Sequence, residues 1–252
     1  MFQYASLRGI AANRGFNWKI PPIDATRVHG YDLFRLFEMP GVSSENIGYV
    51  PYPTYFTKRG DGVNSTGFAF DQELFASVPD NVNINAFLQS PKYFEHIESL
   101  IRSDFKLKQI IAEPAQSLIE SLGGDVIALH VRRGDYVRLR DYHQPLSLPY
   151  YEQALSLLPE LPVVICTNDK EWVKSEPFFT RPNFTTADFH DYGEELAVFT
   201  LASNVVMANS TFSWWGAWLS QARAIIAPKT WFGPKLKSNS LADLYDKDWV
   251  LI

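Results

Sequence analysis

The second half of the chain repeats one pattern, and that pattern restricts the possible folds more than any other feature. After Gly123-Gly124, short apolar runs alternate with helical segments of about 10–15 residues. Each apolar run is expected to be a strand, and the runs lie within residues 125–131, 161–169, 183–188, 204–210 and 223–229. Strands separated by helices pair in parallel. The sequence therefore predicts a parallel, doubly wound α/β sheet in this half, with a last helix over residues 240–252.

The first half of the chain is less regular. Residues 1–14 are expected to form an amphipathic helix that ends at a glycine. Prolines and glycines interrupt residues 16–90, which predicts short strands joined by loops. Gly123-Gly124 closes a helical stretch and separates the two halves, so we expect domains at residues 1–122 and 123–252.

Polar side chains gather where four of the predicted strands end. They are His130, Arg132, Arg133 and Asp135 after the first strand, Thr167-Asn168-Asp169 after the second, Asp188 after the third, and Asn209, Ser210, Thr211 and Ser213 after the fourth. The carboxyl ends of parallel strands share one edge of a sheet, where doubly wound proteins bind their ligands. We therefore expect these clusters to line one crevice.

Two of the clusters are suited to an anion. The planar fork of an arginine fits phosphate oxygens, and a helix N-terminus attracts anions through free N–H groups and a partial positive charge. Arg133 on one side and the helix start at Ser210–Ser213 on the other would hold a diphosphate between them. The alternatives are an arginine pair that closes onto nearby carboxylates, and serines that only cap a helix.

Charge and composition exclude other classes of partner. The chain carries 23 basic and 28 acidic side chains, a net charge of −5, so no broad basic face is available for nucleic acid. It contains no run of about 18 apolar residues that would span a membrane. Cys166 is the single cysteine and lies in an apolar run, as expected of a buried small side chain in a reducing compartment. No two histidines have metal-ligand spacing, so no metal site is expected.

Two further positions carry candidate functional groups. Glu194-Glu195 opens a predicted helix, where acidic residues are favourable, and Glu195 equally offers two acceptor oxygens to the N–H edge of a guanine. His143, with Asp141 and Tyr142, follows the arginine loop closely. This group either positions a substrate hydroxyl or forms a solvated loop.

Several segments resemble a known family. HVRRGDYV at 130–137 resembles the His-x-Arg-Arg-x-Asp motif of glycosyltransferase family 11, the α-1,2-fucosyltransferases. ANSTFSWWGAWL at 208–219 and ICTND at 165–169 resemble two further motifs of that family. MFQYA at residues 1–5 matches the end of the family's N-terminal Gly-rich stretch. The Gly-rich turn and the strand before it have no counterpart here, so we expect the N-terminal sheet to lack a central strand and the activity of this chain to suffer.

The resemblance implies a GT-B fold, with two Rossmann-like domains that face each other across a cleft. Residues 1–122 would form the acceptor side and residues 123–252 the GDP-fucose-binding side. The implied reaction moves L-fucose from GDP-β-L-fucose, with inversion, to the 2-hydroxyl of a terminal galactose, without a metal or other cofactor. Arg133 would bind the donor phosphates, Glu195 the guanine, and His130, Arg132 and Asp135 would shape the loop. Asp169, Asn209, Ser210, Thr211 and Ser213 would complete the donor site.

The proton of the acceptor hydroxyl needs a base. Asp135 is the nearest candidate, His143 the next, and an oxygen of the leaving phosphate is the third. The acceptor is expected to be a galactose-terminated glycan, selected by loops around residues 50–95. The family implies a bacterial-type cytoplasmic enzyme, brought to the membrane surface where its acceptor is lipid-linked. The alternatives are a non-catalytic nucleotide-sugar or glycan-binding remnant of the family and a transferase for a different nucleotide sugar.

Overall fold

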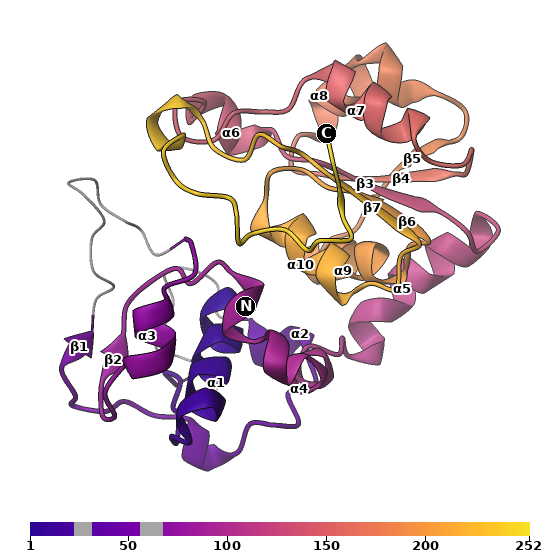
Figure 1. Cartoon of the computed structure of the whole chain (residues 1–252). Coiled ribbons are helices and arrows are strands. Elements are labelled where there is room, and N and C mark those ends of the chain that lie inside the picture. The colour runs from indigo at the N-terminus through magenta and orange to yellow at the C-terminus, as the bar shows by residue number, and fades with distance from the viewer. Residues whose placement is uncertain (23–31, 56–67) are drawn as a thin grey trace. The chain divides into compact units, whose positions relative to one another are not determined.

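The structure is a computed structural model that describes residues 1–22, 32–55 and 68–252 (Figure 1). Contacts divide the chain into two compact units. The first unit comprises Met1–Lys106 and Asn239–Asp246, and the second comprises Leu107–Ser238 and Lys247–Ile252. The division differs from the boundary expected at Gly123-Gly124, because α5 (Gln109–Ser121) packs against α9 (Tyr192–Leu201) of the second unit. The acceptor and donor roles of the two halves stay predictions.

The first unit is built around the N-terminal helix that the sequence predicts. Helix α1 spans Phe2–Arg14 and ends at Gly15, whose φ of 67° favours glycine. The other helices are α2 (Leu33–Leu36), α3 (Gln72–Ser77) and α4 (Glu98–Asp104), with 3-10 turns η1 (Ser44–Asn46), η2 (Pro91–Tyr93) and η3 (Glu95–Ile97). Strands β1 (Thr54–Tyr55) and β2 (Asn83–Ile84) pair in parallel. In the described part of this unit the sheet is these two strands, fewer than a Rossmann-like domain implies. Residues 56–67 of the expected acceptor loops lie outside the described residues.

A buried ion pair connects α1 to α4 in the first unit. The Asp104 side chain is 2% exposed and forms an ion pair with Arg8. It also accepts hydrogen bonds from the Tyr4 hydroxyl at 2.7 Å and from the Gly41 backbone N–H at 2.9 Å. The buried charge is therefore both paired and hydrogen-bonded, which offsets the cost of removing it from water.

The second unit contains a six-stranded parallel sheet of order β5-β4-β3-β6-β7-β8. Its strands are β3 (Ile127–Val131), β4 (Val163–Thr167), β5 (Phe184–Thr186), β6 (Asn204–Val206), β7 (Ala224–Ala227) and β8 (Val250–Leu251). Ile127 lies in register with Val163 on one side and Asn204 on the other. The predicted doubly wound α/β sheet is confirmed, and each of the five expected strands is present.

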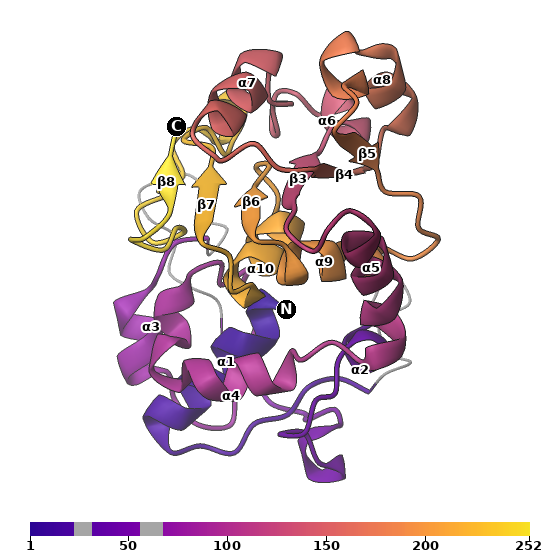
Figure 2. The same ribbon diagram turned by 90° about the vertical axis from the view of Figure 1, so that its right-hand side faces the viewer.

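Helices cover both faces of this sheet (Figure 2). Helices α5, α9 and α10 (Thr211–Leu219) lie on one face, and α7 (Leu148–Ser156) and α8 (Lys170–Ser175) lie on the other, with η4 (Pro177–Thr180) following α8. Side chains of a strand alternate between the two faces. Ile127, Leu129 and Val131 belong to the core cluster formed with α7, whereas His130 contacts rings of α9 and α10. Two short elements remain: α6 (Gly134–Arg138), which follows β3, and η5 (Pro234–Leu236), which follows β7.

The end of the chain differs from the predicted helix. Residues 240–249 form turns, and Val250–Leu251 become β8, which pairs with Ile226 and Ala227 of β7. The backbone N–H of Ile252 also donates to the Ala227 carbonyl at 3.1 Å. Pairing with the edge strand β7 thus determines the conformation of these residues, and local helix propensity does not predict such pairing.

Candidate functional site

The strand order places the topological switch point of the sheet between β3 and β6. From β3 the chain winds outward to β4 and β5, then returns to β6 on the other side of β3. Such a reversal of strand order is the point where open α/β sheets bind ligands, at the carboxyl ends of the strands. The segments that leave this point are residues 132–135 after β3, which include the first turn of α6, and residues 207–210 after β6. The first and fourth polar clusters expected from the sequence therefore flank one switch point.

Arg132 is held on the β6 side of the loop. Its Nη2 lies 2.9 and 3.0 Å from the two carboxylate oxygens of Asp135. Its guanidinium lies 5.2 Å from the ring centroid of Tyr136, whose hydroxyl donates to the Asn209 carbonyl at 3.0 Å. Arg132 Nε is buried and has no hydrogen-bond partner among the described residues. The Arg132 guanidinium therefore retains an N–H donor close to the start of α10.

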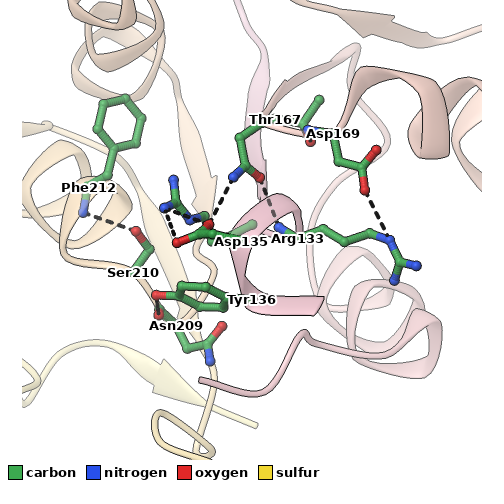
Figure 3. Close-up of polar contacts among 10 residues, drawn as sticks. Arg133, Asp135, Tyr136, Thr167, Asp169, Asn209, Ser210 and Phe212 are labelled. Carbon is green, nitrogen blue, oxygen red and sulfur yellow. Dashed lines mark hydrogen bonds and ion pairs between the residues drawn. The ribbon is translucent and has the colours of Figure 1, made fainter. Parts of the chain in front are cut away.

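Arg133 points in another direction. Its Nε lies 3.2 Å from Asp169, and its guanidinium lies 4.4 Å from the Trp172 ring centroid. Figure 3 shows Arg133 and Asp169 on one side of Asp135, with Ser210 and Phe212 on the other. The expected placement of Arg133 opposite the Ser210–Ser213 helix start is therefore not observed. The carboxylate and ring at the start of α8 hold this guanidinium, and Arg132 is the arginine nearest the expected position.

The start of α10 is capped by its own side chains. The Ser210 hydroxyl accepts a hydrogen bond from the Phe212 backbone N–H at 3.3 Å, and Thr211 is the first helical residue. The buried Ser213 hydroxyl bonds with the Ala208 backbone at 3.2 Å. The capping role considered for these serines is thus confirmed. It leaves the positive end of the helix at the switch point, where an anion is favoured.

Asn209 joins three loops rather than presenting its amide to a ligand. Its Nδ2 donates to the carbonyls of Gln144 at 2.9 Å and Trp231 at 3.0 Å. The backbone carbonyl of Asn209 accepts a hydrogen bond from the Tyr136 hydroxyl. Both N–H groups of the amide are therefore used, whereas its Oδ1 is buried without a hydrogen-bond partner among the described residues. The place of Asn209 in the donor site stays a prediction.

His130 is buried on β3 with its ring near Phe199 and Phe212, at centroid distances of 5.7 and 5.5 Å. Burial, with a smaller contribution from the Arg132 charge, lowers its pKa to about 3. The imidazole is therefore neutral near pH 7. Its Nδ1 has no hydrogen-bond partner among the described residues. His130 thus packs below the arginine loop as a neutral side chain and does not exchange protons at neutral pH.

His143 lies over the same loop. Its ring stacks on Tyr136 at a centroid distance of 4.9 Å and an interplanar angle of 21°. Burial lowers the pKa of His143, the Asp135 charge raises it, and the Arg132 charge lowers it further. The structure thus brings His143 near Arg132 and Asp135. Asp141 is not part of this group, because it pairs with Lys235 at 3.0 Å.

The two glutamates at the start of α9 have different roles. Glu194 completes a capping box, since its carboxylate accepts from the Asp191 backbone N–H at 3.3 Å. Burial raises the pKa of Glu195 to about 7, and the nearby Lys170 charge lowers it. Lys170 itself pairs with the exposed Asp188 at 2.8 Å. A carboxyl that titrates near neutral pH is typical of functional sites.

Sequence reasoning missed two aromatic residues of this site and named Asn168 only as part of the polar cluster after β4. Trp172 binds Arg133, Tyr136 links Arg132 to the β6 loop, and Asn168 bonds to the loop after β3. Asn168 belongs to the polar cluster after β4, so its position at a strand end was an available signal. Trp172 and Tyr136 are aromatic residues that core packing explains equally well from sequence.

Two negative findings apply to residues 1–22, 32–55 and 68–252. They contain no cluster of three or more His, Cys, Asp or Glu side chains placed to hold a metal ion. None of their helices combines the length and apolar content needed to cross a bilayer. Metal independence and membrane association through a lipid-linked acceptor stay predictions.

Comparison with known proteins identifies the class of the chain. A solved structure titled NodZ α-1,6-fucosyltransferase co-crystallised with GDP matches 87% of this chain and 87% of its own, with a TM-score of 0.56 and 17% identity. With the doubly wound sheet and the arginine loop at its switch point, the fold is that of a GT-B glycosyltransferase. The model of glycosyl transferase family 11 matches residues 69–252. The chain belongs to that family.

Curated relatives are distant and longer. The O-antigen biosynthesis glycosyltransferase WbnK of Escherichia coli is 28% identical over 128 residues, 46% of this chain and 42% of WbnK. An α-1,2-colitosyltransferase of Escherichia coli is 29% identical over 73% of this chain and 67% of its own length. Rabbit galactoside α-(1,2)-fucosyltransferase 2, from Oryctolagus cuniculus, is 25% identical over 87% of this chain and 63% of its own length. The chain thus spans about two thirds or less of these relatives.

Proposed function

We propose that the protein transfers L-fucose from GDP-β-L-fucose, with inversion, to the 2-hydroxyl of a terminal galactose. Family membership and the names of the α-1,2-transferring relatives support this reaction. The observation that carries it is the Arg132 guanidinium at the switch point, with an unpaired buried Nε beside the start of α10. An arginine and a helix N-terminus together bind a diphosphate without needing a broad basic surface.

The leaving group is the part of the reaction that this site serves best. Departure of GDP places negative charge on the β-phosphate as the fucosyl group becomes oxocarbenium-like. Arg132 and the Ser210–Ser213 helix start stabilise this charge more in the transition state than in the ground state, which accelerates the reaction. Arg132 takes the role that the sequence assigned to Arg133. Arg133 stabilises the start of α8 through Asp169 and Trp172. No metal is required in this proposal.

The acceptor proton goes to His143. Asp135 is a weaker candidate, because one oxygen already accepts from Asn168 and both oxygens face Arg132. The imidazole of His143 is neutral near pH 7, since burial lowers its pKa. A pH–rate profile should therefore lose its acidic limb in His143→Ala and keep it in Asp135→Asn.

Glu195 reads the nucleotide base. Guanine presents two adjacent N–H donors. An ionised carboxylate accepts both with its two oxygens, whereas a neutral amide has only one acceptor oxygen. The half-buried position of Glu195 at the start of α9 makes such a contact stronger than it would be in water. The donor is accordingly a guanosine diphosphate sugar, and the acceptor is a galactose-terminated glycan.

A ligand screen tests the proposal. The melting temperature is measured with GDP, UDP and CMP, each with and without EDTA, and fucosylated product is then sought with a galactose-terminated acceptor. We expect stabilisation by GDP alone, unchanged by EDTA, and a product linked through the 2-hydroxyl. Stabilisation by UDP or CMP in place of GDP would refute the donor, and GDP binding without product would identify a non-catalytic binder.

A further inference from the structure

The side-chain amide of Asn168 connects the end of β4 to the loop after β3. Its Oδ1 accepts a hydrogen bond from the backbone N–H of Arg133 at 3.0 Å. Its Nδ2 donates to a carboxylate oxygen of Asp135 at 3.2 Å. Asp135 in turn pairs with Arg132 at 2.9 Å. One amide therefore holds both the loop backbone and the carboxylate that orients the guanidinium.

The sheet register brings these groups together. Val131, the last residue of β3, pairs with Thr167, the last residue of β4, so the residues that follow the two strands meet. The approach is close at Gly134, where an added Cβ would lie 2.5 Å from Asn168 Nδ2 and 3.3 Å from the Asn168 carbonyl oxygen. A side chain at residue 134 would therefore displace the Asn168 amide.

Asparagine is chemically specific for this position. The two bonds require one acceptor and one donor on the same short side chain, which an amide supplies. A carboxylate would satisfy the Arg133 N–H but would repel Asp135, and an apolar side chain would satisfy neither group.

We infer that Asn168 is a positioning residue of the diphosphate site: it holds Asp135 against Arg132 and so sets the direction in which Arg132 meets the donor. The inference rests on the proposed function only in naming a nucleoside diphosphate as the ligand. Asn168 does not touch the reacting atoms in this scheme. Its effect passes through Asp135.

The test compares Asn168→Ala and Asn168→Asp with the control Asn183→Asp. Asn183 lies in the turn just before β5 and donates a side-chain hydrogen bond to the Leu161 carbonyl at 3.3 Å, at the opposite end of the strands. The hydrogen-exchange rate of the Arg133 amide shows whether its bond to residue 168 is intact. Calorimetry measures the affinity for GDP, and steady-state kinetics separate kcat from the acceptor KM. Melting temperatures show that each variant is folded.

Asn168→Ala should exchange the Arg133 amide faster, whereas Asn168→Asp keeps an acceptor for that amide. Both variants should lose about 10-fold or more in GDP affinity and kcat, with the acceptor KM unchanged. Asn168→Asp should lose more than Asn168→Ala, while Asn183→Asp behaves like the wild type. Gly134→Ala, which displaces Asn168 by contact, should repeat the loss and provides a second variant if the first pair unfolds.

Two results would overturn the inference. One is wild-type exchange at Arg133 in Asn168→Ala, since the bond would then be absent. The other is faster exchange with wild-type GDP affinity and kcat, since the bond would then have only a structural role. Failure of the wild type to bind any nucleoside diphosphate would instead refute the proposed function, and the exchange measurement would still decide whether Asn168 holds the loop.

Discussion

Replacing Arg132 and Arg133 separately gives the sharpest test of the site, because these two neighbouring arginines contact different side chains. Arg132 faces Asp135 and Tyr136 and keeps a buried Nε without a partner among the described residues. Arg133 forms an ion pair with Asp169 and lies against the Trp172 ring, although its Nε likewise makes no hydrogen bond among the described residues. We expect Arg132→Ala to lose most of the transferase activity and Arg133→Ala to lose little.

The magnitudes follow from these contacts. Removing one preorganised donor to a developing charge costs about 2.7–4 kcal/mol, or about 10²–10³ in kcat. The Arg133 side chain is 30% exposed and its partner Asp169 is 27% exposed, so solvent screens the pair. Such a pair contributes about 1 kcal/mol or less, and mainly to stability. The two variants should therefore differ by about 2 kcal/mol in the barrier, or about 30-fold in kcat/KM.

The assay is initial-rate transfer from GDP-fucose to a galactose-terminated acceptor, with Arg223→Ala as control. Arg223 pairs with Asp125 at 3.1 Å, before β7 and β3 begin, at the far end of the sheet. Its loss should leave kcat/KM unchanged. Near-normal turnover in Arg132→Ala, or an equal loss in Arg133→Ala, would refute the assignment of the phosphate to Arg132.

Three further predictions concern buried ionisable groups. Burial raises the folded-state pKa of Glu195 to about 7, so its ionisation destabilises the fold as pH rises from the ordinary value of 4.5 through 7. Glu195→Gln should therefore melt higher than the wild type above pH 7 but bind GDP more weakly, and an unchanged GDP affinity would contradict its role at the base. Burial lowers the pKa of His130 to about 3, so below its ordinary value of 6.5 the unfolded chain takes up a proton that the folded protein does not. His130→Phe should flatten the fall of melting temperature between pH 6.5 and 3, and a parallel curve would show that His130 is not the cause. Asp104→Ala should lower the free energy of unfolding by about 3–5 kcal/mol in urea titrations, because it leaves the Arg8 charge unpaired, and a loss under about 1 kcal/mol would contradict the buried pair.

The second half of the fold was predictable because its signals are local. Strands β3 and β4 are buried along their whole length and read as continuous apolar runs. The glycine that ends α1 is equally local. The tail was not predictable, because Val250–Leu251 form a strand only by pairing with β7. The extent of α5 was not predictable either, because Pro114 lies inside this helix, where proline is disfavoured.

The location of the site was predictable from the sequence, but the contacts of its side chains were not. Strand ends converge by topology, so His130, Arg132 and Asn209 were expected near one another. The direction of Arg133 depends on a carboxylate and a ring that follow β4, and the use of the Asn209 amide depends on carbonyls in two other loops. Each of these side chains could contact several partners. Tertiary packing determines which partner it contacts, and residue type alone does not.

The division of the chain into units has a practical consequence for dissecting the protein. Residues 239–246 belong to the first unit, where Asp243 forms an ion pair with Lys92 and accepts from the Phe70 backbone N–H at 3.4 Å, although both flanking segments belong to the second. The backbone therefore passes from one unit to the other three times. A fragment or chimera cut once, near residue 106, would contain residues 239–246 without the first-unit residues that they contact. Failure of such a fragment to fold would therefore say little about whether the second unit folds by itself.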